Sequence, residues 1–496
     1  MKKWRLYGLG LTFFCVCFLF FKGEILATES ENTEEKRLEE LIPIGEKFLF
    51  EDGDIVGFIG DSITHVEYTE ISYQEFLYNY YITRYPKWKL EFRNLGTGSF
   101  MASDVLELYN GEKGIYDAEL EGITKAVIML GMNEALSGVS AEEYISNIQA
   151  VTELLRNRGL KYEDIILVAP TPFDQTRTSN YPEEGQMNAH FDDALSEYTS
   201  RIRILAKKLG TKYIDLHTPM LWATTILQKD NGEATLTIDD SVHPSGAANV
   251  LAGYFFLRQQ GAEEIVASVR ISENGQIVTE NAQVKSLKQS GDRYVRFSYQ
   301  PHSLPVAVPL EVKTADQYFG MLDQISQEIL QVESLNWDTT YTVCMNHVPV
   351  GEFTGAELGQ GVNLASYDWN LGQVAAKDIE TLNQKWHKVS AKYRAVLRKS
   401  TREKKGATQE DVNAAYAEWE EESRELREEM YDIARSSVDK AYVVEIISED
   451  AHVWMGQELK EWVAEGITAL LFLGVLVFVW RHRKQLKKNN SKQESN

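Results

Sequence analysis

Cysteine is almost absent from this chain of 496 residues, which contains only three. Cys15 and Cys17 lie inside an apolar run at the N-terminus, so a processed chain would keep only Cys344. A single cysteine cannot form an internal disulfide, and a hydrophobic content of 43% is enough to pack a core without one. We therefore expect Cys344 to be a small buried residue.

Basic residues are also scarce, because 51 Lys and Arg stand against 74 Asp and Glu and give a formal net charge of −23. Nucleic acids and anionic lipid surfaces bind through basic patches, so this balance argues against both as ligands of the central part of the chain. Histidines at metal-ligand spacing are missing too, since His190, beside Asp192 and Asp193, has no second histidine near it. We expect neither a metal nor a cofactor.

The N-terminus has the pattern of a secretory signal. Three basic residues precede an apolar run over residues 6–21, and the tripeptide Ile-Leu-Ala at 25–27 offers a cleavage site. We predict a signal peptide over residues 1–27, followed by a polar, acidic linker over residues 28–48. An uncleaved signal anchor is the alternative.

A second apolar run predicts a transmembrane helix over residues 462–480. Residues 467–480 carry no charge, and at about 1.5 Å per residue the whole run approaches the thickness of a bilayer core. A basic tail follows over residues 481–496, which predicts a cytoplasmic tail and places the rest of the chain outside the cell membrane. A buried or amphipathic terminal helix is the alternative.

The pattern of residues 49–262 predicts an α/β domain with a parallel sheet. Short apolar runs alternate there with amphipathic stretches of helical length, and strands connected in this way pair in parallel. Ligands bind such sheets at the carboxyl ends of the strands. Ser62, Gly98 and Asn133 each follow an apolar run, so we expect all three at that edge. The runs lie near residues 55–60, 89–94, 125–130, 163–169 and 211–216.

Two segments contain the groups that nucleophilic catalysis by a serine requires. Ser62 follows the first apolar run, where the chain must turn sharply, and Asp240 and His243 stand three residues apart far downstream. A hydroxyl needs a base to take its proton, and an imidazole needs a group that orients it. Asp215 and His217 could imitate the second pair, because residues two apart on a strand share a face.

Two further blocks lie between these segments, in residues 94–99 and in residues 131–134 (Gly-Met-Asn-Glu). Taken in order, the four blocks resemble those of the SGNH (GDSL) hydrolases, a family of serine esterases with a flavodoxin-like, three-layer α/β/α fold. Shorter stretches are similar to extracellular bacterial members with a C-terminal extension, and the resemblance covers about residues 50–400. It implies that Ser62 is the nucleophile and that His243 is the base, oriented by Asp240.

The resemblance also implies an oxyanion hole. Its donors would be the backbone N–H of Ser62, an N–H of the turn at Gly98 and Ser99, and the side chain of Asn133. The family's glycine aligns with Ser99, so the turn's donor is either Gly98 or Ser99. Glu134 stands where the family usually has aspartate, and we expect this change to affect contacts around the site only.

The remainder of the chain changes character twice. Residues 263–372 alternate like strands and predict a β-rich accessory unit, which would pack on the catalytic domain or bind carbohydrate. Residues 373–455 predict a helical hairpin, broken at residues 406–408, with Thr408 and Asp411 capping its second helix.

These observations favour a cell-surface serine esterase that hydrolyses O-acyl esters, acetyl esters first, on a small molecule or a glycan. A lipid acyl hydrolase or lysophospholipase is the rival within the enzymes, and an acyltransferase would differ only in the acceptor of the acyl group. A catalytically silent binding protein on the same fold is the alternative from another class. The oligomeric state is left open.

Overall fold

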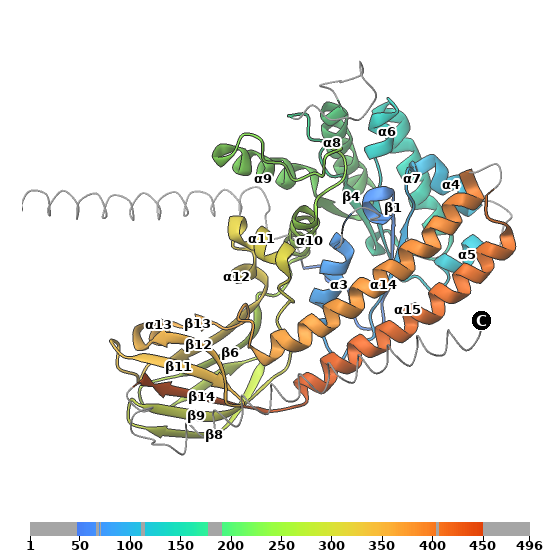
Figure 1. The fold of residues 1–496 in the computed structure, drawn as a ribbon. Coiled ribbons are helices and arrows are strands. Elements are labelled where there is room, and N and C mark those ends of the chain that lie inside the picture. Colours follow the sequence, from blue (N-terminus) through green and yellow to red (C-terminus); the bar gives the residue numbers. More distant parts are fainter. Residues whose placement is uncertain are drawn as a thin grey trace, which may run out of the picture. The chain divides into compact units, whose positions relative to one another are not determined.

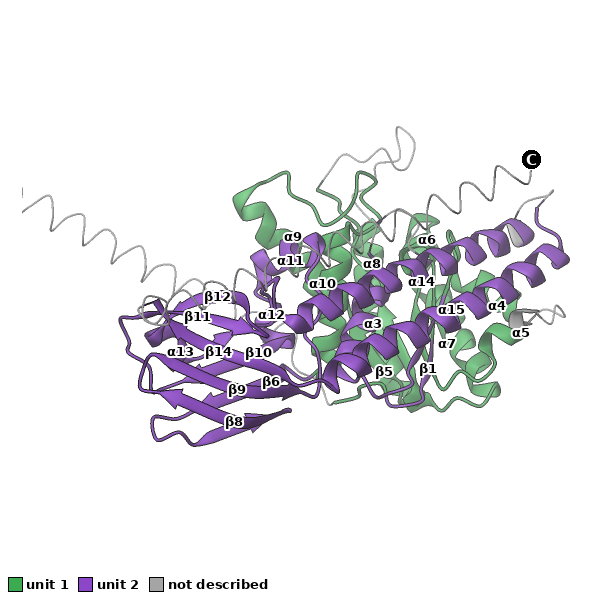
Figure 2. Cartoon of the chain, turned by 60° about the horizontal axis from the view of Figure 1, so that its bottom comes forward, with its two compact units in different colours: residues 1–50, 57–64, 95–262 green, residues 51–56, 65–94, 263–496 purple. Residues whose placement is uncertain are grey.

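The computed structural model describes residues 47–65, 69, 71–110, 115–176, 191–402 and 406–449. The predicted signal peptide (1–27), transmembrane helix (462–480) and basic tail (481–496) lie outside the described residues. Within these ranges, no helix has the length and apolarity that a membrane span needs. Contacts divide the chain into two compact units, coloured in Figure 2. Unit 1 comprises residues 1–50, 57–64 and 95–262, and unit 2 comprises residues 51–56, 65–94 and 263–496.

The predicted α/β fold with a parallel sheet is confirmed. Five strands follow the order β2-β1-β3-β4-β5, and β4 pairs in parallel with both of its neighbours. All five residues of β4 are buried, as expected for a strand covered on both faces. The strands are β1 (Ile55–Gly60), β2 (Glu91–Gly96), β3 (Lys125–Met129), β4 (Ile165–Ala169) and β5 (Lys212–Asp215).

Helices connect these strands at the lengths that parallel crossovers require. Several begin at a side-chain cap; the Ser140 hydroxyl accepts from Glu143 N–H, and the Ser245 hydroxyl accepts from Ala248 N–H. The helices are α2 (Ser62–His65), α3 (Tyr73–Arg84), α4 (Ala102–Asn110), α5 (Ile115–Leu120), α6 (Met132–Leu136), α7 (Ala141–Asn157), α8 (Phe191–Leu209), α9 (His217–Asp230) and α10 (Gly246–Gln260).

Residues 265–363 form most of two further sheets, both in unit 2. One has the order β13-β10-β6-β7 and the other the order β12-β11-β14-β9-β8, and their apolar faces share one core. Their strands are β6 (Ile265–Ile271), β7 (Ile277–Glu280), β8 (Ala282–Ser290), β9 (Tyr294–Pro301), β10 (Gln327–Val332), β11 (Thr340–Met345), β12 (Val348–Thr354) and β13 (Val362–Asn363), with short helices α11 (Leu310–Phe319), α12 (Leu322–Ile325) and α13 (Gly355–Gln360). Cys344 is buried in β11.

Two long helices follow, α14 (Leu371–Arg402) and α15 (Gln409–Val438), and they lie side by side in Figure 1. Thr408 and Asp411 form the capping box that starts α15, as their spacing indicates. Indole Nε1 of Trp419 donates to the Ser390 hydroxyl at 3.1 Å and joins the two helices.

The segment 373–455 is not helical throughout. Residues Tyr442–Ser448 form β14, which lies between β11 and β9 in the five-stranded sheet. Its apolar side chains complete a core whose other buried members lie at or before Leu364 in the chain, and no local pattern indicates such pairing.

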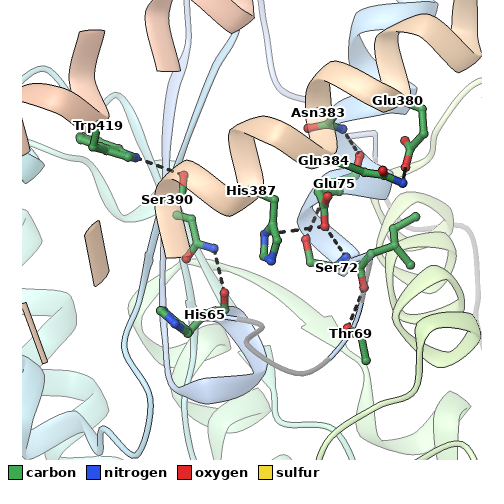
Figure 3. A network of polar contacts seen from close by, with 12 residues as sticks. His65, Thr69, Ser72, Glu75, Glu380, Asn383, Gln384, His387, Ser390 and Trp419 are labelled. Carbon is green, nitrogen blue, oxygen red and sulfur yellow. Dashed lines mark hydrogen bonds and ion pairs between the residues drawn. The ribbon is translucent and has the colours of Figure 1, made fainter. Parts of the chain in front are cut away.

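Helix α3 belongs to unit 2, although it lies between two blocks of the predicted catalytic segment. All twelve of its side chains are buried, including polar ones that contact α14. Figure 3 shows part of this network, in which Asn383 Nδ2 donates to the Glu75 carbonyl at 2.7 Å. Asn79 Nδ2 also donates to the Glu380 carboxyl, at 3.3 Å.

Candidate active site

Ser62 lies at the first position of α2, immediately after the buried strand β1. The turn requires glycine at position 60, because a Cβ there would meet Thr64 Oγ1 at 2.1 Å and the Met129 carbonyl oxygen at 2.7 Å. Asp61 is 2% exposed, and its Oδ1 accepts from Ile63 N–H at 2.9 Å. This carboxylate therefore holds the turn that presents the serine.

His243 connects Ser62 with Asp240. Its Nε2 lies 2.8 Å from Ser62 Oγ, and its Nδ1 lies 2.5 Å from Asp240 Oδ2. The second carboxylate oxygen of Asp240 accepts from the N–H groups of Val242 and His243, both at 2.9 Å. Partial burial opposes ionisation of Asp240, but these hydrogen bonds outweigh it and hold its pKa below the ordinary value.

The loop that carries this pair is anchored at both sides. Thr237 and Pro244 form an isolated antiparallel bridge, and Ile238 N–H donates to the His243 carbonyl at 2.9 Å. Ser241, between Asp240 and His243, has a left-handed backbone (φ 62°), and its carbonyl accepts from Asp174 N–H. A non-glycine residue in this conformation is strained, which is a frequent property of functional loops.

The alternative pair of Asp215 and His217 is not formed. Asp215 accepts from the N–H and the hydroxyl of Thr218, both at 2.9 Å. His217 Nε2 instead lies 3.1 Å from Asp192 Oδ1, and both side chains are buried. Sequence reasoning did not find the pair of Asp192 and His217, because 25 residues separate its members.

The two other predicted oxyanion segments lie on either side of Ser62. In the sheet, β1 is flanked by β2, which precedes Gly98, and by β3, which precedes Asn133. Residues 97–100 form a turn closed by Phe100 N–H and the Thr97 carbonyl at 3.1 Å. Ser99 takes the left-handed conformation in this turn (φ 63°), which is the conformation that favours glycine there.

Asn133 is half-buried at the start of α6, and its Nδ2 donates to the Phe100 carbonyl at 3.0 Å. The side chain that would bind an oxyanion is therefore held against the turn that would supply the backbone donor. Gly131, which precedes α6, has a φ of 133°, so the tight entry into this helix also depends on glycine.

A cavity of about 170 Å³ lies next to the His243 loop. It is enclosed by the segment after β4, by α9 and by Thr237 and Pro244, which flank the loop. Apolar side chains and threonines form most of its wall, among them Phe173, Met220 and Thr224. No sequence pattern had indicated it, because its wall combines three distant segments.

Residues 58–251 match the model of the GDSL-like lipase/acylhydrolase family. The chain thus carries a GDSL-type esterase domain. This confirms the family resemblance, and the enzyme is a carboxylic ester hydrolase.

Among curated proteins, this chain is similar to isoamyl acetate-hydrolyzing esterase 1 homolog of Rattus norvegicus. The two are 25% identical over 183 residues, which are 35% of this chain and 70% of the rat protein. Among solved structures, a gut microbial diltiazem-metabolizing enzyme shares the fold at a TM-score of 0.69 and 20% identity, over 82% of this chain and 99% of that one. The match to an acetylxylan esterase from Geobacillus stearothermophilus covers 44% of this chain and 97% of the esterase chain, at 18% identity and a TM-score of 0.33.

Proposed function

We propose that this GDSL-type enzyme removes short O-acyl groups, acetate first, from a carbohydrate by a Ser-His-Asp acyl-enzyme mechanism. The observation that carries the proposal is the continuous chain of short contacts from Ser62 through His243 to Asp240. The rat relative, named for the hydrolysis of an acetate ester, supports a short acyl group.

In the first half-reaction, Ser62 Oγ attacks the ester carbonyl carbon while His243 Nε2 takes the hydroxyl proton. Asp240 keeps the imidazole in the tautomer whose Nε2 accepts, and it stabilises the imidazolium that forms. The developing oxyanion would be bound by the Ser62 N–H, an N–H of the 98–99 turn and Asn133 Nδ2. When the tetrahedral intermediate collapses, the C–O bond to the alcohol breaks and His243 returns the proton to the leaving oxygen.

In the second half-reaction, water attacks the acyl-enzyme and His243 takes one of its protons. The ester bond to Ser62 breaks, the proton returns to Ser62 Oγ, and the acid leaves. An acyltransferase would use a sugar hydroxyl in place of this water, with the same proton transfers.

We place the enzyme at the cell surface as part of the same proposal, and the support is the sequence of its two ends. A basic and apolar N-terminus and an uncharged run over 467–480 followed by basic residues favour export with a C-terminal anchor. Protease added to intact cells should then remove the esterase activity and leave a small membrane-bound fragment; an enzyme protected until lysis would contradict this location.

The activity is tested with the full chain on aryl esters from acetate to dodecanoate, with Ser62→Ala alongside. We expect a maximum at acetate that disappears in the variant, and then release of acetate from acetylated glycans. A maximum at long chains would replace the carbohydrate substrate by a lipid. Labelling by a fluorophosphonate, lost in Ser62→Ala, reports a competent serine independently of the ester chosen. Absence of both labelling and hydrolysis would favour the silent binding protein.

A further inference from the structure

Two adjacent side chains of α6 hold the same short segment of the chain. Asn133 Nδ2 donates to the Phe100 carbonyl at 3.0 Å, and Glu134 Oε1 accepts from Ala102 N–H at 2.8 Å. Strand β1 separates β2 from β3 in the sheet, so no strand pairing links the turn after β2 with the helix after β3. These side-chain bonds are therefore a direct connection between the two segments that would bind the oxyanion.

Glu134 makes its bond in an environment that disfavours a charge. The side chain is 1% exposed, and no described residue makes a hydrogen bond with its Oε2. Burial raises its pKa from 4.5 to about 7, although the N–H groups of Ala102 and of Glu134 itself act in the opposite direction. At neutral pH a substantial fraction of this carboxyl group is therefore protonated.

Among the described residues, the groups that interact electrostatically with Glu134 are acids and phenols. Asp61 faces it from the β1–α2 turn and Asp104 from α4, and both disfavour its ionised form. The negative charge of Glu134, when ionised, contributes to raising the pKa of Tyr144 on α7 and of Tyr198 on α8. Ionisation of Glu134 would add a second negative charge near Asp61, the residue that directly precedes Ser62.

We propose that Glu134 is a positioning residue of the esterase: its side chain accepts from Ala102 N–H, holds α6 against the 100–102 segment and so keeps Asn133 at the distance that the oxyanion requires. The inference rests on the proposed function. Asn133 would contact the reacting oxygen only as its charge develops, so displacement of α6 lowers kcat and leaves KM nearly unchanged.

Two substitutions test the hydrogen bond. Glu134→Gln keeps the size and the carbonyl oxygen that accepts from Ala102 N–H, but it cannot ionise. Glu134→Ala removes the bond altogether. Glu233→Gln is the matched control, because Glu233 is an exposed glutamate of the same unit.

The experiment measures kcat and KM of the full chain on an aryl acetate from pH 5 to pH 9. In Glu134→Ala we expect kcat to fall by about 10- to 100-fold, less than the complete loss of an oxyanion donor costs, with KM within about threefold. In Glu134→Gln we expect kcat within about threefold of the wild type at every pH, because the amide oxygen still accepts from Ala102 N–H. Glu233→Gln should follow the wild type throughout.

Several results would overturn the inference: an unchanged kcat in Glu134→Ala, a change confined to KM, or a loss of kcat in Glu134→Gln as large as in Glu134→Ala. If Glu134→Ala does not fold, which thermal unfolding reports, Glu134→Met replaces it, because methionine fills the site without accepting from Ala102 N–H. Activity that is lost in Ser62→Ala but insensitive to Glu134 refutes this inference and leaves the proposed function standing. An enzyme without Ser62-dependent activity refutes both.

Discussion

His243 Nε2 lies 2.8 Å from Ser62 Oγ, although 181 positions separate the two residues in the sequence. The serine is presented by the turn after β1, and the histidine by the loop before α10. A distance of 2.8 Å is that of a hydrogen bond through which a proton can be transferred. Both residues therefore need the contacts that hold their side chains at this distance.

Asp240→Asn should lower kcat by about 10⁴-fold with little change in KM, because an amide facing His243 Nδ1 favours the wrong imidazole tautomer. The substituted side chain still offers an oxygen to the N–H groups of Val242 and His243, so the loop should keep its conformation. Steady-state kinetics check this, with the exposed neighbour Asp239→Asn as control. Asp240→Asn activity within tenfold of wild type would mean that another group orients His243.

Asn133→Ala should lower kcat by about 10²- to 10³-fold, the typical cost of one oxyanion donor. Ser99→Ala should keep kcat within about threefold, because any donor at this turn is a backbone N–H and alanine tolerates the φ of 63° about as well as serine. The comparison is made on one aryl ester at one pH. Equal losses in the two variants would assign a function to the Ser99 hydroxyl.

Gly60→Ala should destabilise the fold by roughly 2 kcal/mol or more, because the new methyl group would overlap Thr64 Oγ1 and the Met129 carbonyl. Gly232→Ala is the control, since a Cβ there meets no atom within 4 Å. Urea unfolding of both variants measures the difference. A Gly60→Ala protein as stable as Gly232→Ala would show that the turn before Ser62 rearranges freely.

Glu380→Gln should stabilise the protein at neutral pH but not at pH 4.5. Burial raises the pKa of Glu380 from 4.5 to about 7, so the folded chain retains a proton that the unfolded chain releases. A group of this kind contributes stability that is complete below about pH 4.5 and is lost as the pH rises through 7.

Thermal unfolding of Glu380→Gln and wild type at pH 4.5 and 7.5 tests this sign. The groups near Glu380 are Asn79 and Gln384, which donate to it, and the acids Glu75 and Glu311. Figure 3 shows Gln384 and Glu75 beside Glu380. The exposed Glu428→Gln on α15 is the control. An equal Tm difference between wild type and Glu380→Gln at both pH values would contradict the prediction.

The parts of the molecule that sequence could predict have local causes. Strands β1, β2 and β3 are visible in the sequence as apolar runs. Parallel-sheet topology then places Ser62, Gly98 and Asn133 at the carboxyl ends of these strands. Thr408 and Asp411 lie three residues apart, which is the spacing of a capping box and predicts the start of α15. The distances that join His243 to Ser62 do not follow from spacing, and only the order of the four sequence blocks suggested them.

The parts that escaped prediction depend on distant partners. Strand β14 pairs with β9 and β11 across the whole helical hairpin, and its apolar residues resemble those of any short buried segment. The pair of Asp192 and His217 and the bond from Glu134 to Ala102 are contacts between elements, to which no local pattern corresponds.

The membership of α3 in unit 2 limits how this enzyme can be taken apart. Arg84 at its end donates to the carbonyls of Ile265 and Ile325, and the Glu75 carbonyl near its start accepts from Asn383 Nδ2 of α14. A gene fragment that encodes only residues 49–262 would leave this helix with polar side chains that have lost their partners and with apolar ones facing water. The segment that contains the esterase motifs therefore cannot be transferred alone. Recombination between relatives would have to exchange the C-terminal region together with it.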